Sequence, residues 1–284
     1  MEWGHAVMNG EPRTQDEYDK RQTEAAYRVL VDVGQVLAAF DDCLVLIGGW
    51  VPDLLLPNAQ DPHVGSIDVD FALDAQKLND GRYADLVGQL LNTRRYRPGR
   101  KPFQLVADVD LRDGGAPVQV EVEFLAPKEV KLEKNKPKLL KGFRVLQADA
   151  CGTAFREPVQ IQIEGRTIHG ARDKVRIRVA SLVDFLVMKA HALEGRDKPK
   201  DSYDLCYCLD HYPGGIEELA AAWRRRTGDG DVRRAIEILH DKFTSPENFG
   251  PAQVVEFFNS ANVDARAMQA RRAFELVQKL LRLI

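Results

Sequence analysis

Two aspartates one residue apart, Asp68 and Asp70, are the residues of this sequence whose type and spacing most directly suggest chemistry. They fall in the stretch 66–71 (Ser-Ile-Asp-Val-Asp-Phe), whose apolar and polar residues alternate, so a strand would place both carboxylates on one face. Like charges on a strand face repel each other unless a cation or a basic group neutralises them. Because Mg²⁺ takes one or two carboxylates together with phosphate oxygens, the pair predicts a site for Mg²⁺ or Mn²⁺. The alternative is a solvated strand edge.

A glycine pair, Gly48 and Gly49, follows the apolar run 44–47 and precedes a short predicted helix over 50–56. A tight strand-to-helix turn alone would be reason enough for glycine. The functional interpretation adds that backbone N–H groups at a helix start can bind a triphosphate. Ser66 could donate its hydroxyl to the same phosphates, although a polar strand residue is the plainer explanation. Together with the aspartates, this turn predicts a phosphate-binding site beside a metal site, which is the arrangement that nucleotidyl transfer requires.

A third carboxylate is expected, because a two-metal site must hold two cations close together. The predicted strand 118–125 supplies two candidates on one face, Glu121 and Glu123. Glu123 is favoured, since it lies nearer the strand end, where active-site loops gather, and Glu121 is the substitute. The alternative is that neither residue is a ligand. A rival pair, Asp108 and Asp110, lacks a glycine-rich neighbour and is interpreted as a polar strand end.

A lysine on an apolar helix stripe, Lys189, is the most informative residue of the second half. In the predicted helix 182–194 it must either extend to the helix edge or point into a cleft. With acids expected opposite, the sequence predicts the cleft and a contact with nucleotide phosphates. Arg196 follows in a loop, and Asp201 and Asp204 open the next helix. Their spacing lets both acids project towards Arg196 or Lys189, although acids in a first turn also suit the helix dipole.

These motifs resemble those of a known family. The glycine pair and the Asp-x-Asp are similar to the signature of the DNA polymerase β-like nucleotidyltransferase superfamily. The stretch 181–209 resembles the second conserved block of the AbiEii/AbiGii toxin family within that superfamily. Such proteins are toxins of bacterial toxin–antitoxin and phage-defence systems, and some transfer nucleotides onto tRNA ends. Ser66 stands where the family often has threonine, and aspartate is commoner than glutamate at the third acid.

The resemblance implies roles for the residues above. A metal ion would be held by Asp68, Asp70 and Glu123, and the catalytic group would add Lys189 and Asp204. Nucleotide contacts would come from Ser66 and Lys189, and Asp201 or Asp204 would have a supporting or catalytic role. Together with the residue patterns above, the expected nucleotide-binding set is Gly48, Gly49, Ser66, Lys189, Arg196 and Asp201. The implied reaction moves an NMP from an NTP to an acceptor, with RNA (tRNA) favoured and a cognate antitoxin protein as a further partner. The alternatives are a small-molecule (antibiotic-type) nucleotidyltransferase and a non-catalytic nucleotide-binding protein on the same fold.

Composition limits the class of protein. The 284 residues are 44% hydrophobic and 29% charged, with a net charge of −3, as in a soluble globular protein. RNA contact would therefore need a local basic patch, for which 128–141, 224–226 and 233–234 are candidates; the alternative is ordinary solvated faces. The four scattered cysteines predict reduced thiols. No apolar run reaches membrane-spanning length and no signal peptide is recognised, so a cytoplasmic protein without membrane contact is expected.

The order of elements predicts an α+β fold. A mixed-sheet nucleotidyltransferase domain is expected over 1–180, with a flexible arm over 1–15, and a helical bundle over 181–284. Ser181 is the expected N-cap of the first helix of that bundle. Further helices are expected at 16–40 and 80–95, and strands at 43–47, 66–73, 103–110, 118–125, 158–163, 166–168 and 174–179.

Overall fold

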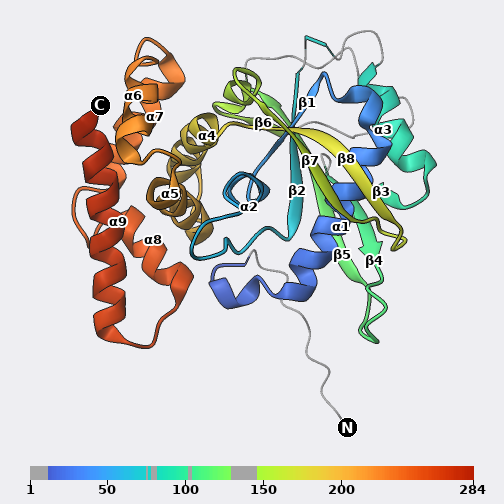
Figure 1. Ribbon diagram of the computed structural model, residues 1–284, viewed down its shortest axis with the longest axis horizontal. Coiled ribbons are helices and arrows are strands. Elements are labelled where there is room, and N and C mark those ends of the chain that lie inside the picture. The colour runs from blue at the N-terminus through green and yellow to red at the C-terminus, as the bar shows by residue number, and fades with distance from the viewer. Residues whose placement is uncertain (1–11, 75, 78–81, 102–103, 129–145) are drawn as a thin grey trace.

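The computed structural model describes residues 12–74, 76–77, 82–101, 104–128 and 146–284, and its centre is one mixed eight-stranded sheet (Figure 1). The strands are β1 (Leu44–Ile47), β2 (Asp68–Leu73), β3 (Tyr96–Pro98), β4 (Gln104–Val109), β5 (Val118–Pro127), β6 (Leu146–Ala148), β7 (Val159–Arg166) and β8 (Arg172–Val179). Their order is β3-β4-β5-β2-β1-β8-β7, with β6 beside β5. The predicted mixed sheet followed by helices is confirmed.

Helices lie on one face and at one end of the sheet. The α-helices are α1 (Lys20–Val36), α2 (Trp50–Leu55), α3 (Arg82–Asn92), α4 (Leu182–Gly195), α5 (Pro199–His211), α6 (Ile216–Arg224), α7 (Gly230–Lys242), α8 (Phe249–Phe258) and α9 (Val263–Leu283). Short 3₁₀ turns are η1 (Gln15–Glu17), η2 (Ala38–Phe40) and η4 (Cys151–Phe155). The expected helix over 16–40 is therefore interrupted at both ends.

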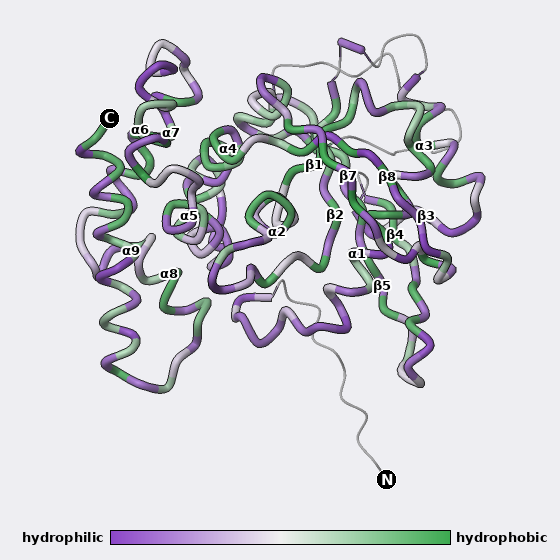
Figure 2. Tube along the Cα trace, in the orientation of Figure 1, coloured by the Kyte–Doolittle hydropathy of each residue, from purple (hydrophilic) through white to green (hydrophobic). Residues whose placement is uncertain are grey.

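The central strands β1 and β2 position the candidate site. They pair antiparallel, while β5 runs parallel to β2 on its other side. All four residues of β1 are buried, which explains an apolar run without alternation. Figure 2 shows hydrophobic residues concentrated in β1 and α2, whereas α9 alternates between hydrophilic and hydrophobic residues as a surface helix does.

Helix α1 covers one face of the sheet, in contact with β5, β7 and β8. It begins at Asp19, whose side chain accepts hydrogen bonds from the backbone N–H groups of Arg21 and Gln22. Its small residues let the sheet approach closely, since a Cβ at Gly34 would lie 3.0 Å from the Val175 side chain. The buried face is formed by Ala25, Ala26, Val29, Leu30 and Val33.

The hairpin β7–β8 corrects the sequence-based prediction of three short strands over 158–179. Strand β7 continues through Gly165 to Arg166, and its residues pair in register with β8. Gly165 is not a break but a packing position, because a Cβ there would lie 2.7 Å from the ring of Tyr27 on α1. The sequence could not reveal that close approach, which depends on a helix far away in the chain.

The helices after β8 form two layers. Helix α4 begins as predicted, with the Ser181 side chain accepting from the Asp184 N–H. It contacts α2, α5 and α7, while α5 contacts α8 and α9, so α4 and α5 lie between the sheet and the outer helices (Figure 1). The division of the chain at residue 180 into two domains stays a prediction.

Two predicted basic or mobile segments fall largely outside the described residues. Residues 1–11 of the predicted arm lie there, but Arg13 forms ion pairs with Glu256 (2.6 Å) and Asp197 (3.0 Å), so the end of the arm is attached to the helical part. Of the lysine-rich stretch 128–141 only Lys128 is described.

The cysteines and the helices agree with the expectations from composition. All four cysteines, Cys43, Cys151, Cys206 and Cys208, are buried free thiols. Burial raises the pKa of Cys43 to about 11 and that of Cys206 to about 12, so both stay protonated at neutral pH. Within the described part of the chain, no helix is long and apolar enough to cross a membrane.

Shortening a buried side chain of the central strand β1 should destabilise the fold. Leu46 is completely buried, so Leu46→Ala is expected to lower the free energy of unfolding by about 2–5 kcal/mol, because it leaves a cavity. The matched control is Val263→Ala at a position that is 76% exposed, where a change within about 0.5 kcal/mol is expected. Urea titration of both variants measures the difference, and equal effects would contradict the buried position of β1.

Candidate active site

Strand pairing brings the predicted acids together at the centre of the sheet. Because β2 and β5 run parallel in register, Asp68 lies beside Glu121 and Asp70 beside Glu123. Registered residues of adjacent strands share a face, so all four carboxylates belong to the same face of the sheet. On the other side of β2, Asp70 is opposite Ile47, the last residue of β1. The structure thus places the acids directly beside the glycine turn.

The electrostatics distinguish the two aspartates. Burial and the negative charges of Asp68 and Glu123 raise the pKa of Asp70 well above its ordinary value. Burial also opposes ionisation of Asp68. There, however, the positive charge of Lys198, the hydrogen bond from Ser66 and the charge of Lys200 lower the pKa. The carboxyl groups of the cluster are therefore difficult to ionise all at once unless a further cation is present.

Polar neighbours hold the outer two carboxylates. The Ser66 hydroxyl donates to Asp68 Oδ1 (2.5 Å), and the Gln104 amide donates to Glu123 Oε1 (3.0 Å). The ammonium group of Lys101 lies 3.4 Å from the same oxygen of Glu123. The charge of Glu123 acts on Asp70, and the preference for Glu123 over Glu121 as the third acid stays a prediction.

The glycine pair makes room for side chains of the site. Gly48 has φ +75°, and a Cβ there would lie 2.5 Å from Asp70 Oδ2. A Cβ at Gly49 would lie 2.7 Å from Lys200 Nζ and 2.8 Å from Ser66 Oγ. Both positions therefore require glycine for space, and Gly48 also for its left-handed backbone. The predicted contact of this turn with a triphosphate stays a prediction.

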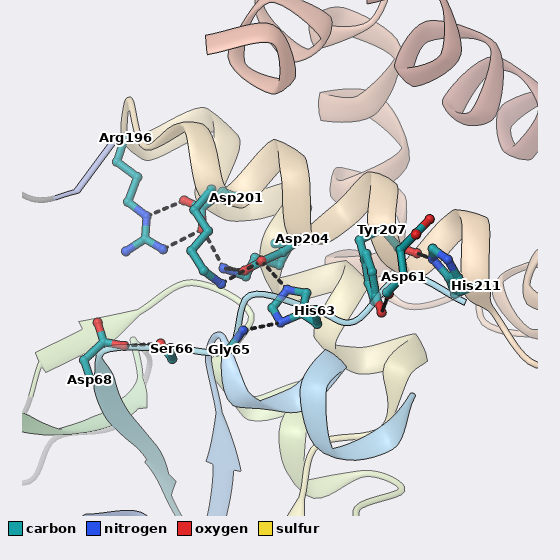
Figure 3. Close-up of polar contacts among 12 residues, drawn as sticks. Asp61, His63, Gly65, Ser66, Asp68, Arg196, Asp201, Asp204, Tyr207 and His211 are labelled. Atoms are coloured by element: carbon teal, nitrogen blue, oxygen red, sulfur yellow. Dashed lines mark hydrogen bonds and ion pairs between the residues drawn. The ribbon is translucent and has the colours of Figure 1, made fainter. Parts of the chain in front are cut away.

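The loop between α4 and α5 faces the acids with positive charge. Lys198 is the strongest cationic influence on both Asp68 and Asp70, and Arg196 acts on Asp70 as well. Arg196 is half exposed and is held by Asp201, with Nε 2.6 Å from Oδ2 and an Nη 2.9 Å from Oδ1 (Figure 3). The predicted approach of Asp201 to Arg196 is present, whereas the contact of Arg196 with a nucleotide stays a prediction.

Lys189 is buried between acids of its neighbouring helix. Its Nζ lies 2.7 Å from Asp201 Oδ1 and 2.8 Å from Asp204 Oδ2, and the residue is only 8% exposed. Burial disfavours the charged lysine, but the two carboxylates outweigh it and raise its pKa. The predicted pairing with Asp201 and Asp204 is confirmed, whereas the predicted opening into a cleft is wrong, because these acids enclose the amine. Its contact with nucleotide phosphates stays a prediction.

His63 connects the loop before β2 to α5, as Figure 3 shows. Its Nδ1 accepts from the Gly65 N–H (3.1 Å), so its Nε2 carries the proton and donates to Asp204 Oδ1 (3.0 Å). Lys200 reaches the same oxygen at 2.7 Å. The Tyr207 hydroxyl donates to the Asp61 carbonyl in the same loop. These bonds fix the segment that carries Ser66 and Asp68.

Sequence reasoning missed several residues of this site. Lys200 could have been found, because it stands four residues before Asp204 on one helix face. Lys198 gave no signal of its own, because a lysine in a loop is common. His63 and Gln104 gave no signal, since a single histidine in a loop and a glutamine in a strand are common. Their roles depend on partners 141 and 19 residues away.

The donor set suits a divalent cation, although the carboxylates are not gathered around a point. Among the described residues, no group of three or more His, Cys, Asp or Glu side chains stands in the arrangement of a formed metal site. Nevertheless Asp68, Asp70 and Glu123 offer only oxygen ligands, which Mg²⁺ prefers, and their mutual repulsion raises the pKa of Asp70. A cation would relieve that repulsion, in exchange for the hydrogen bonds from Ser66 and Gln104.

Comparisons with known proteins give a family and two similar solved structures. The model of the family described as "Nucleotidyl transferase AbiEii toxin, Type IV TA system" matches residues 28–276. An antigenic nucleotidyltransferase-like protein from Paracoccidioides brasiliensis is 16% identical, with a TM-score of 0.43 over 83% of this chain and 94% of that one. The nucleotidyltransferase toxin MenT4 from Mycobacterium tuberculosis is 17% identical, with a TM-score of 0.40 over 95% and 94%. No curated protein matches.

The protein is thus a nucleotidyltransferase. The chain belongs to the AbiEii nucleotidyltransferase toxin family, because the family match covers most of its length. The resemblance seen in the sequence motifs is confirmed. Membership in a toxin family of type IV toxin–antitoxin systems implies an NTP as substrate and an antitoxin as partner.

Adding a methyl group at the glycine turn should disturb the acids. Gly48→Ala is expected to lose most transfer activity, because the new Cβ would displace the Asp70 carboxylate. The matched control is Gly170→Ala, where φ is +84° and nothing lies within 4 Å of the added Cβ. Both should lose about 1–2 kcal/mol of stability from backbone strain. Activity assays and thermal melts compare the two, and an active Gly48→Ala enzyme would argue against this geometry.

Acid should weaken the connection made by His63. Burial lowers the pKa of His63 to about 4, with Lys200 contributing and Asp204 opposing. Between pH 6.5 and 4 the histidine of the unfolded chain, with a pKa of about 6.5, is protonated, whereas His63 of the folded chain is not. Stability from this residue is therefore full above pH 6.5 and falls by at most about 3 kcal/mol as the pH drops from 6.5 to 4. NMR titration checks the pKa, and a midpoint near 6.5 would contradict the buried neutral ring. His63→Gln should flatten the pH dependence of stability.

Proposed function

We propose that this nucleotidyltransferase moves an NMP from an NTP to an RNA acceptor, with tRNA favoured, and that the transfer depends on Mg²⁺ or Mn²⁺. One observation carries the proposal: Asp68, Asp70 and Glu123 share one face of two paired strands, beside the glycine turn and opposite Lys198. Negative charge for a cation and positive charge for phosphates thus occur side by side.

The reaction uses these two kinds of charge differently. An acceptor hydroxyl oxygen forms a bond to the α-phosphorus of the NTP while the bond to pyrophosphate breaks, and pyrophosphate leaves. The hydroxyl proton passes to a carboxylate oxygen of the acidic cluster. Asp68, Asp70 and Glu123 would hold a divalent cation, which would neutralise charge on the phosphates. Lys198 and Arg196, on the facing loop, are placed to bind the phosphate oxygens.

The buried helix-pair cluster has a positioning role in this proposal. Asp201 and Asp204 have pKa values below the ordinary range, because Lys189, with Arg196 or Lys200, outweighs the effect of burial. Asp201 holds the guanidinium group of Arg196 in a fixed orientation, and Asp204 holds His63. The catalytic residues expected from the resemblance would therefore have two different roles. Asp68, Asp70 and Glu123 would act on the substrates, whereas Lys189 and Asp204 would belong to the ion pairs that orient the loops.

The RNA acceptor has support from the family resemblance but not from the arginine-rich stretches. Arg226 pairs with the buried Asp184 (2.5 Å), and Arg234 pairs with Glu194 and Glu237. Arg224 and Arg233 donate to backbone carbonyls. These arginines stabilise turns and helix contacts, so a phosphate-binding surface is better sought on the sheet face that carries the acids.

Replacement of the aspartates tests the proposal. Asp68→Asn and Asp70→Asn are each expected to reduce transfer more than about a hundredfold, because the charge that balances the reacting phosphates is removed. Asp70→Asn should melt at or above the parent temperature, since it relieves repulsion in the cluster. The control is Glu164→Gln on the distant strand β7, which should stay fully active.

The assay supplies each α-labelled NTP, Mg²⁺ and total cellular RNA, and binding of Mn²⁺ is followed separately by electron paramagnetic resonance. Label on RNA that disappears in both aspartate variants supports the proposal. Label that enters only low-mass products points instead to a small-molecule acceptor. Unchanged Mn²⁺ binding in both aspartate variants would refute the assignment of the metal site.

A further inference from the structure

A second, basic pocket opens at the edge of the sheet, away from the acidic cluster. Its volume is about 480 Å³, and its lining comes from the turn before β3, the turn after β4 and the β7–β8 turn. Four arginines and a histidine face two aspartates across it. None of Asp68, Asp70 and Glu123 lines this pocket, so it requires its own explanation.

The floor of the pocket is built from buried groups. Arg95 Nε lies 3.1 Å from Asp32 Oδ2, and the Tyr96 hydroxyl donates to the same oxygen (2.7 Å). Asp32 is 1% exposed and Tyr96 is 3% exposed. A buried carboxylate on α1 thus fixes the position of Arg95, so the floor does not depend on mobile surface side chains.

The mouth of the pocket carries uncompensated positive charge. Arg94 and Arg112 are both exposed, and across the described ranges no acid forms an ion pair with either guanidinium group. Arg97 is balanced by Asp108, with 2.9 Å between Nη and Oδ2. Four arginines against two aspartates leave the lining with a net positive charge, which favours an anionic ligand.

The same two arginines are among the four residues other than glycine that have a positive φ in the described part of the chain. Arg94 has φ +60° and Arg112 has φ +58°, both in the left-handed region. This region costs a residue other than glycine about 1–2 kcal/mol. Glycine would relieve the strain at both turns but would remove the guanidinium groups. Backbone strain of this kind is concentrated at binding sites, where the side chain has a use.

One residue of the pocket lining, Arg97, shares a face of the sheet with the acidic cluster, whereas its neighbour Tyr96 faces α1 on the other side. Arg97 of β3 is in register with Val106 of β4, which is in register with Glu121 of β5, which is in register with Asp68. Three strand spacings separate Arg97 from Asp68, or about 14 Å between backbones. A short stretch of nucleic-acid backbone can cover that distance, so one strand could contact both places.

We propose that this pocket binds phosphate groups of the acceptor strand and directs its end towards Asp68 and Asp70. The inference rests on the proposed function only in taking RNA as the acceptor. Guanidinium groups suit this ligand because they donate paired hydrogen bonds to phosphate oxygens. Binding through Arg94 and Arg112 makes the affinity sensitive to salt and insensitive to base sequence.

The test compares Arg94→Ser/Arg112→Ser with Arg225→Ser/Arg282→Ser, a double variant with the same loss of charge on exposed residues of the helical part. Binding of a short fluorescein-labelled single-stranded RNA is measured by anisotropy at several salt concentrations, without NTP or metal. The pocket variant is expected to bind about tenfold more weakly and to lose about 1.4 from the slope of log K against log salt. The control variant should match the parent.

Parallel titrations with inorganic phosphate identify the source of the ligand. A loss of RNA affinity confined to the pocket variant supports the acceptor path. If only inorganic phosphate binding changes, the pocket is a free-anion site and the acceptor path is overturned. Equal RNA affinity and slope in all three proteins also overturn it. The assay needs no catalysis: pocket-dependent RNA binding without transfer to any RNA would refute the proposed function and leave the pocket standing.

Discussion

The structure depends on ion pairs that neutralise buried carboxylates. Asp201 and Asp204 are completely buried on α5, and they tolerate this only because Lys189 and Lys200 lie within 2.8 Å. Removing one partner of such a pair would leave a buried charge without compensation, which is strongly unfavourable. The cluster therefore fixes α4 against α5. Through Arg196 and His63 it also fixes the two loops that face the acids of β2.

The acids of the sheet show the opposite condition. Asp70 is buried and crowded by Asp68 and Glu123, and the positive charges that act on it most strongly, those of Lys198 and Arg196, belong to the loop between α4 and α5. The protein thus pairs the buried carboxylates of α5 with cations and leaves the carboxylates of the proposed site short of positive charge. That difference is what distinguishes a site prepared for a cation and phosphates from an ordinary ion-pair network.

The sequence predicted much of this arrangement because the signals were local. The alternation around Asp68 and Asp70, the glycine pair and the Ser181 cap each depend on residues close in the chain, and each takes its predicted form. Where partners were distant, prediction failed. The strands predicted at 158–163 and 166–168 are one strand, because Gly165 between them packs against Tyr27 of a distant helix. The approach of Asp201 and Asp204 to Lys189 was predicted, but the complete burial of both acids depends on how the helices pack.

The family and the fold class thus follow from the chain itself, since motif spacing and the order of strands and helices are properties of the sequence. Other features depend on the tertiary structure alone. They are the positions of Glu121 and Glu123 beside the two aspartates, the hydrogen bond between His63 and Asp204, and the strand register that aligns Arg97 with Asp68. The physical reason is that strand register and helix packing set distances between residues far apart in sequence. Charge interactions, and with them each pKa, follow those distances.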